Sequence, residues 1–307
     1  MLKQLRAYYD ANGISAVGFC CKHQAECSAG APGFTAAKET FVGPKYITSG
    51  LPRLVFLSLD SGSGKSEPAT RTMEAVQRRN LDRNFHELPK NNHWYQTHDL
   101  ALTLLQPFDP SLRIERVLPH FAHVNSAKCC QNNPEHRKAD RAMFENCRDY
   151  IGEEIRILRP DILVTQGKEA RQAVEHHFAG LDAGEVAVDA EGNGYRVIQT
   201  AADHHTIWFA THHPRNYGRF WEQKRTCWSR YAQAAVGFVN GTPFEWTDTD
   251  VAHGVKRTLT KTTTRKVTNS TQAGQPERRA RMSAAARKAV SVRMRKYWAA
   301  RRRVNED

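Results

Sequence analysis

Four short apolar runs, each followed by polar residues, restrict the fold of this chain more than any other feature. The runs span residues 54–59, 121–125, 161–165 and 206–211. Amphipathic stretches typical of helices fall at about residues 99–105, 138–158, 168–178 and 219–239. Strands alternating with helices of this length predict a three-layer α/β/α fold, in which helices cover both faces of a mainly parallel sheet.

Three of the predicted strands end in residues that can do chemistry. Asp60 follows the first run, Asn125 ends the second, and His213 follows the fourth. The carboxyl ends of parallel strands meet at one edge of the sheet, and ligands bind there. We therefore expect Asp60, Asn125 and His213 to share one site.

The positive charge lies almost entirely at one end of the chain. The whole sequence has 45 Lys and Arg against 32 Asp and Glu, a formal net charge of +13. Residues 251–307 hold 16 of the basic and 3 of the acidic side chains, so residues 1–250 are neutral. This distribution predicts a folded domain over residues 1–250 and a separate basic arm that binds a polyanion.

The arm divides into two segments by composition. Residues 251–280 are rich in threonine and poor in apolar residues, which predicts a flexible linker. Residues 281–307 predict a basic helix in which Tyr297 and Trp298 can stack on bases, so nucleic acid is the expected partner. The alternative is a charged helix that only faces solvent.

The sequence predicts neither a membrane span nor a signal peptide. No stretch approaches the roughly 18 apolar residues of a membrane span, and residues 1–13 lack the apolar run of a signal peptide. We expect a cytoplasmic monomer that does not bind membranes.

Cysteines occur in two separated groups and one isolated position. Their odd number and the lack of a secretory signal favour metal or cluster ligation over disulfides. Four thiolates from two segments suit zinc or an iron–sulfur cluster, whereas buried unligated cysteines are the alternative. The sequence does not decide between the members of the two adjacent pairs. The seven are Cys20, Cys21, Cys27, Cys129, Cys130, Cys147 and Cys227, the last of which we expect in the core.

Several of these residues together resemble a known family. Asn125-Ser-Ala-Lys-Cys129, followed by Arg137 and Cys147, resembles a segment of the iron–sulfur uracil-DNA glycosylases of families 4 and 5. Thr211-His-His-Pro214 resembles the second active-site motif of that superfamily, and Leu57 to Gly62 occupies the place of the first. The resemblance covers about residues 15–240. It implies the uracil-DNA glycosylase fold and a 4Fe–4S cluster, with zinc as the alternative. The implied cluster ligands are Cys21, Cys27, Cys129 and Cys147.

The chain departs from the family pattern at two places. Its amino-terminal cysteines are spaced Cys-Cys-x5-Cys, where the family usually has Cys-x-x-Cys. Its first motif is Ser58-Leu-Asp-Ser-Gly62, so Asp60 takes the position of the water-activating aspartate of the best-known uracil enzymes.

The chemistry of N-glycosidic bond cleavage suits these residue types. Positive charge develops on the sugar and negative charge on the leaving base, so a site needs an anion near the sugar and hydrogen-bond donors around the base. Asp60 can supply the anion and position water, His213 can donate to the base O2, and Asn125 can bind a pyrimidine edge. Tyr217 stands where the superfamily places its intercalating residue, and would fill the gap left by a flipped base. The alternatives without a catalytic role are a helix-capping Asp60, a core His213 and a surface Tyr217.

Substrate choice depends on the residue facing C5 of the base. Uracil enzymes keep a bulky side chain there, whereas this chain has Gly62 beside Ser61, which predicts an open pocket. Aromatic residues that could stack on the base or refill the space are Phe85, Trp94 and Tyr95.

The sequence therefore predicts a monofunctional DNA glycosylase acting on uracil or a 5-modified pyrimidine, including bulky modified cytosines such as those of phage DNA, in repair or defence. It would bind single- or double-stranded DNA through the active-site face and the basic arm. The rival hypothesis is a non-catalytic nucleic-acid-binding protein with structural zinc.

Overall fold

The computed structural model describes most of the first 244 residues. By their contacts the residues fall into two units, Met1–Trp246 and Thr247–Asp307. The predicted linker and basic helix lie outside the described residues, as do Ser61, Gly62 and the side chains of Asp60 and Tyr217. The described residues are 1–29, 34–60, 67–131, 139–178, 186–188, 193–242 and 244.

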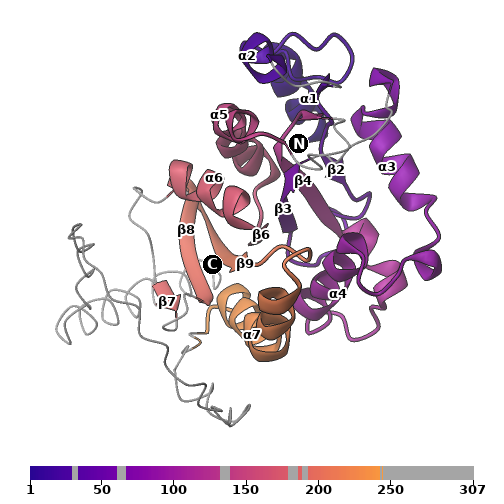
Figure 1. Cartoon of the computed structure of the whole chain (residues 1–307). Coiled ribbons are helices and arrows are strands. Elements are labelled where there is room, and N and C mark those ends of the chain that lie inside the picture. The colour runs from indigo at the N-terminus through magenta and orange to yellow at the C-terminus, as the bar shows by residue number, and fades with distance from the viewer. Residues whose placement is uncertain are drawn as a thin grey trace, which may run out of the picture. The chain divides into compact units, whose positions relative to one another are not determined.

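The first unit is built on a seven-stranded sheet with the order β2-β4-β3-β6-β9-β8-β7 (Figure 1). The four central strands, β4, β3, β6 and β9, run parallel, and β2, β8 and β7 add antiparallel edges. The predicted mainly parallel sheet is confirmed in this central part. The bounds are β2 Phe41–Val42, β3 Leu54–Asp60, β4 Phe121–Ala127, β6 Ile162–Gln166, β7 Val186–Val188, β8 Gly194–Ala201 and β9 His204–Thr211, with a separate pair β1 Phe34–Thr35 and β5 Cys130–Gln131.

Helices cover both faces of the sheet, which confirms the three-layer prediction. Helices α1, α5 and α6 pack on one face, α4 and α7 on the other, and α3 beside the edge strand β2 (Figure 1). None of the described helices is both long enough and apolar enough to span a bilayer. The bounds are α1 Leu2–Ala11, α2 Gln24–Ser28, α3 Met73–Leu81, α4 His93–Leu105, α5 Arg141–Leu158, α6 Lys168–Phe178 and α7 Tyr217–Val239, with 3₁₀ turns at Pro68–Thr70, Phe85–Glu87, Ile114–Arg116 and Leu118–His120.

Side chains alternate between the two faces of the central strands. One face of the sheet is apolar, and the other becomes polar toward its carboxyl edge. In β3, Val55 and Leu57 join the core against α1, α5 and α6. Phe56 points to the opposite face, where its ring contacts Phe121. Ser58 follows Phe56 on that face, because side chains two residues apart in a strand share a face. The α4 side of the sheet is therefore apolar in its middle and polar at its carboxyl edge.

A buried carboxylate joins the amino-terminal helix to the sheet. Glu154 of α5 is completely buried, and one of its oxygens accepts hydrogen bonds from the hydroxyls of Tyr9 and Thr40. Its other oxygen forms an ion pair with Lys128, which follows β4 and is 2% exposed. These contacts fix α1, the segment before β2, α5 and the end of β4 to one another.

Removing this carboxylate tests its importance for stability. Glu154→Leu should lower the free energy of unfolding by about 3 to 5 kcal/mol, because Lys128 is left buried without its counterion. The matched control is Glu153→Leu, which removes only a surface ion pair with Arg156 and should cost less than about 1 kcal/mol. Urea unfolding measures both. Equal losses in the two variants would contradict the assigned role of Glu154.

Candidate active site

The strand register places the predicted site residues at one edge of the sheet. Asn125 lies opposite Ser58 in the β3–β4 pair, and the backbone of Asp60 lies opposite Ala127. On the other side, Gln166 of β6 pairs with Thr211, the last residue of β9. Two residues later comes His213. The structure thus brings the carboxyl ends carrying Asp60, Asn125 and His213 together, as the sequence predicted.

A buried hydrogen-bond network underlies this edge. The side-chain oxygen of Gln166 accepts from the Ser58 hydroxyl and lies 3.0 Å from Nε2 of His93. Its side-chain NH2 donates to the Thr97 hydroxyl at 3.1 Å. Nε2 of His123 lies 2.9 Å from the Ser58 hydroxyl, in the position to donate to it. These contacts connect β3, β4, β6 and α4, and satisfy polar groups that burial would otherwise destabilise.

The ring of His213 lies flat against the ring of His93. Their centroids are 4.8 Å apart and the planes differ by 11°. Burial, followed by the charges of His93 and Arg215, lowers the pKa of His213 to about 3. Burial likewise lowers the pKa of His93 to about 4. Both rings are therefore neutral near pH 7.

A neutral histidine carries its proton on one nitrogen, and the surroundings select which one in His213. The backbone N–H of Arg215 donates to Nδ1 of His213 at 3.1 Å, so Nδ1 must be the unprotonated nitrogen. The proton then lies on Nε2. His213 is consequently a neutral hydrogen-bond donor.

Two residues near His213 hold its segment in place. Gln223 of α7 is 4% exposed, and its side-chain oxygen accepts from the backbone N–H of His212 at 2.8 Å. Gly167, between β6 and α6, has φ +109° and no room for a side chain, because a Cβ would lie 2.8 Å from Leu59 and 3.4 Å from the Cβ of His213. The turn therefore requires glycine.

The aromatic residues predicted to stack on a base have other contacts. Trp94 is 9% exposed and packs edge-on against His123 and Phe121. Phe85 stacks on Tyr95, with centroids 5.2 Å apart. Among the described rings, the one stacked on His213 is His93, which was not predicted from the sequence. His93 lies before the predicted start of the helix, where the sequence shows no apolar periodicity that would have indicated it.

The predicted residue Tyr217 and two arginines follow the same edge. Tyr217 begins α7, four residues after His213. Arg215 lies near both stacked histidines, since its charge lowers the pKa of each. Arg219 similarly lowers the pKa of His212. Cations therefore border the site on the β9 side.

The four cysteines that the family resemblance implies as ligands lie near one another. The pKa of Cys129 is raised by burial first, and then by Cys147, Cys21 and Cys27. Burial also raises the pKa of Cys147 to about 11. Cys20, by contrast, is exposed, and Cys130 turns toward Thr35, 2.7 Å from its hydroxyl. The surroundings thus distinguish Cys20 from Cys21, and Cys130 from Cys129.

Hydrogen-bond donors surround three of these sulfurs. The backbone N–H of Lys128 donates to Cys147 at 3.3 Å, and the side-chain NH2 of Asn146 donates to Cys27 at 3.5 Å. The hydroxyl of Tyr150 lies 3.1 Å from the sulfur of Cys21. Such donors stabilise ligating thiolates. Four thiols, three of them buried, with such donors beside them are the ligand type that a 4Fe–4S cluster requires.

Two other observations concern the cysteines. Across the described part of the chain, no three His, Cys, Asp or Glu side chains form a group that could hold a single metal ion. Cys227 is 2% exposed in α7, as predicted for a core residue.

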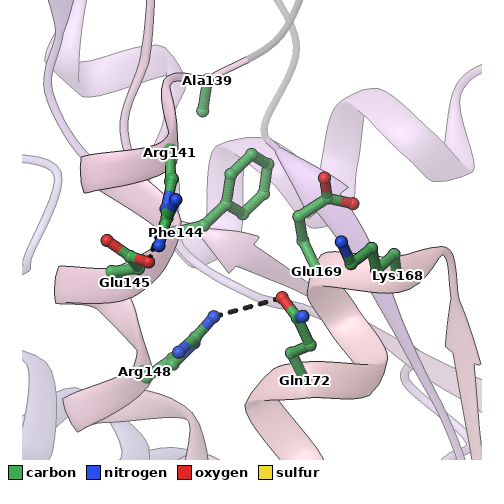
Figure 2. A pocket seen from close by; sticks show the side chains of 8 residues that line it. All are labelled: Ala139, Arg141, Phe144, Glu145, Arg148, Lys168, Glu169 and Gln172. Atoms are coloured by element: carbon green, nitrogen blue, oxygen red, sulfur yellow. Dashed lines mark hydrogen bonds and ion pairs between the residues drawn. The ribbon is translucent and has the colours of Figure 1, made fainter. Parts of the chain in front are cut away.

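A separate hollow of about 470 Å³ opens between α5 and α6 (Figure 2). Its polar side chains bond largely to one another: Arg141 pairs with Glu145 at 2.8 Å, and Arg148 donates to Gln172 at 3.2 Å. Neither Asn125 nor His213 lines it. This hollow is therefore distinct from the candidate site.

Comparison with known proteins identifies the family to which this geometry corresponds. The family model described as the uracil DNA glycosylase superfamily matches residues 44–234, more than half of the chain. A search of curated proteins found no significant match. The matched residues include Asp60, Asn125 and His213.

The protonation state of His213 can be measured directly. Nitrogen-15 NMR of the imidazole rings should show His213 neutral and protonated on Nε2, with no titration between pH 5 and 8. The pKa of about 3 lies below this range, so the ring gains its second proton only in stronger acid. A titration midpoint near the ordinary value of about 6.5 would contradict the burial argument.

Proposed function

The chain belongs to the uracil DNA glycosylase superfamily, and on that premise we propose that it excises uracil or a 5-modified pyrimidine from DNA. The product would be an abasic site in an intact strand. The observation that carries the proposal is the meeting of three strand ends bearing Asp60, Asn125 and His213.

Each of the three residues has a distinct role in the proposed reaction. Water attacks C1′ of the sugar, and the electron pair of the C1′–N bond moves to the base. Asp60 would hold that water, accept its proton and stabilise the positive sugar. His213 would donate through Nε2 to the negative base oxygen, and Asn125 would bind the pyrimidine edge.

A neutral donor suits the oxygen of a departing pyrimidine. An imidazolium would be difficult to maintain here, because burial and the neighbouring Arg215 both disfavour a second positive charge. A neutral Nε2–H avoids that cost, and its hydrogen bond strengthens as negative charge grows on the base.

The substrate class follows from the residue at the C5 position. Gly62 would leave space where other uracil enzymes have a bulky side chain, and this supports activity on 5-modified pyrimidines, including bulky modified cytosines of phage DNA. Trp94 is buried against His123, and Phe85 stacks on Tyr95, so both have partners other than the expected base.

We also propose that Cys21, Cys27, Cys129 and Cys147 hold a 4Fe–4S cluster. The cluster would act structurally, by tying the amino-terminal segment to β4 and α5. Raised thiol pKa values make metal-free thiolates unfavourable at neutral pH, so cluster binding must release protons.

The basic segment 281–307 would add DNA affinity through phosphate contacts. The linker over residues 251–280 would let it reach along the strand.

Catalysis is tested by single-turnover excision on oligonucleotides containing uracil, mismatched thymine or bulky 5-modified cytosines. Alkali-dependent strand cleavage should appear with wild-type protein. Asp60→Asn and His213→Ala should each slow it by orders of magnitude with little change in DNA affinity, because both act mainly in the transition state. Gly62→Tyr should spare uracil and abolish activity on the modified bases. Equal losses of affinity and rate would assign Asp60 and His213 to binding or folding.

The cluster is tested within each cysteine doublet. Cys21→Ser and Cys129→Ser should lose the brown colour and most of the roughly four irons per chain. The matched controls Cys20→Ser and Cys130→Ser should retain both, since Cys20 is exposed and the sulfur of Cys130 lies beside the Thr35 hydroxyl. Colourless wild-type protein with stoichiometric zinc would refute the cluster.

A further inference from the structure

A smaller pocket lies beside α4, and we call it the α4 pocket. Its volume is about 140 Å³. Neither Asn125 nor His213 lines it, so it is distinct from the candidate active site. Its apolar walls include Leu81, Phe85, Leu88, Trp94 and Leu118.

His98 of α4 brings an open hydrogen-bond acceptor to this pocket. The residue is 2% exposed, and its Nδ1 lies 2.7 Å from the carbonyl oxygen of Trp94. A carbonyl can only accept, so Nδ1 carries the proton. Burial lowers the pKa of His98 to about 4, so the ring is neutral near pH 7 and Nε2 is left as an acceptor. None of the described residues forms a hydrogen bond with Nε2.

Asn80 of α3 adds an open amide to the same pocket. The residue is 9% exposed and lines the pocket together with His98. No described residue forms a hydrogen bond with its side-chain oxygen or NH2 group. Buried polar side chains in native proteins usually have partners. Two open ones in a single pocket therefore indicate a ligand that offers both a donor and an acceptor.

The aromatic rings of the pocket suit a flat ligand. The ring centroid of His98 lies 5.2 Å from that of Phe85 and 5.2 Å from that of Trp94. An apolar cavity of about 150 Å³ is known to hold benzene, so this pocket has room for about one six-membered ring. A pyrimidine base has that size, a face that stacks on aromatic side chains, and an edge with both donors and acceptors.

The α4 pocket is close to the candidate active site. His93 and His98 are five residues apart on α4, which corresponds to about 7.5 Å along the helix axis. Trp94 lines the pocket and also packs edge-on against His123 of β4, with centroids 4.9 Å apart. Arg83 is exposed and lines the pocket, so it can contact a phosphate attached to a bound base.

We propose that the α4 pocket binds one pyrimidine base, with an N–H group of the base donating to Nε2 of His98 and its neighbouring edge bonded to the Asn80 amide. The base comes either from an unpaired nucleotide beside the target in the bound DNA strand or from a free nucleoside. The inference rests on the proposed function only in taking DNA as the ligand, and not on which base is excised.

The first experiment tests the DNA strand as the source of the base. Full-length protein is bound to a single-stranded oligonucleotide with a tetrahydrofuran abasic analogue at the target position and cytosines on both sides. Each flanking cytosine is then replaced in turn by the same analogue. One replacement should weaken binding by wild type about ten-fold, because stacking and hydrogen bonds to that base are lost.

Asn80→Leu and His98→Phe should bind the parent oligonucleotide correspondingly weakly and be insensitive to that same replacement. The matched control is Asn91→Leu, because Asn91 is exposed, precedes α4 and does not line the pocket. It should respond to every replacement as wild type does. If Asn80→Leu and His98→Phe also respond as wild type does, the α4 pocket is not the place where the base binds.

The second experiment tests a free nucleoside as the source. Deoxycytidine is added to full-length protein, and nitrogen-15 NMR follows the His98 Nε2 resonance, which is assigned by its absence in His98→Phe. A saturable shift that Asn80→Leu weakens would show base binding in the pocket. If deoxycytidine leaves this resonance unchanged and no flanking replacement alters wild-type affinity, the proposal is overturned.

A stability measurement distinguishes a binding role of Asn80 from a structural one. Asn80→Leu removes an amide without a hydrogen-bond partner, so the midpoint of urea unfolding should not fall. A clear fall would mean that the amide supports the fold, which contradicts its assignment to a ligand. Excision is measured separately: a protein that binds bases in this pocket and excises none would overturn the proposed function and leave the pocket standing.

Discussion

The buried Glu154 carboxylate is the constraint on which the site and the cysteine group both depend. It receives hydroxyls from Tyr9 and Thr40 and pairs with Lys128, a charge that could not remain buried alone. Lys128 lies three residues after Asn125 and directly before Cys129. Its backbone N–H donates to Cys147, and its charge lowers the pKa of that thiol. A single ion pair thus positions the end of β4, from the residue proposed to bind the base to a proposed cluster ligand.

The candidate site combines strong burial with full hydrogen bonding. Gln166 occupies the centre, because its amide can accept from Ser58 and His93 while donating to Thr97. An ionised side chain at this position would need a buried counterion, whereas an amide satisfies its neighbours without charge. The same burial keeps the stacked histidines neutral. The network therefore fixes His93 and, through stacking, His213 before any substrate arrives.

The spacing of apolar residues in the sequence was sufficient to predict the strands and helices that depend on it. The four central strands and α6 lie where apolar spacing placed them, and residues at the strand ends meet as expected. Helix α4 begins six residues before its predicted start, because Asn92 caps a first turn of polar and aromatic residues that carries no apolar stripe. Gln166 and His93 were missed for a related reason. Their importance comes from contacts between elements distant in sequence, which a local pattern does not contain.

The electrostatics of the site determine how DNA binding would act on His213. Three influences lower its pKa: burial, which is the largest, then His93, and then the positive charge of Arg215. A phosphate held beside the site would offset the influence of Arg215 and leave that of burial in place, because DNA that covers the site excludes water further. Neutralising the cations alone would therefore not convert His213 to imidazolium. The backbone N–H of Arg215 also remains on Nδ1, so the proton stays on Nε2. The surrounding cations can thus attract the DNA backbone without changing the protonation state that the proposed chemistry requires.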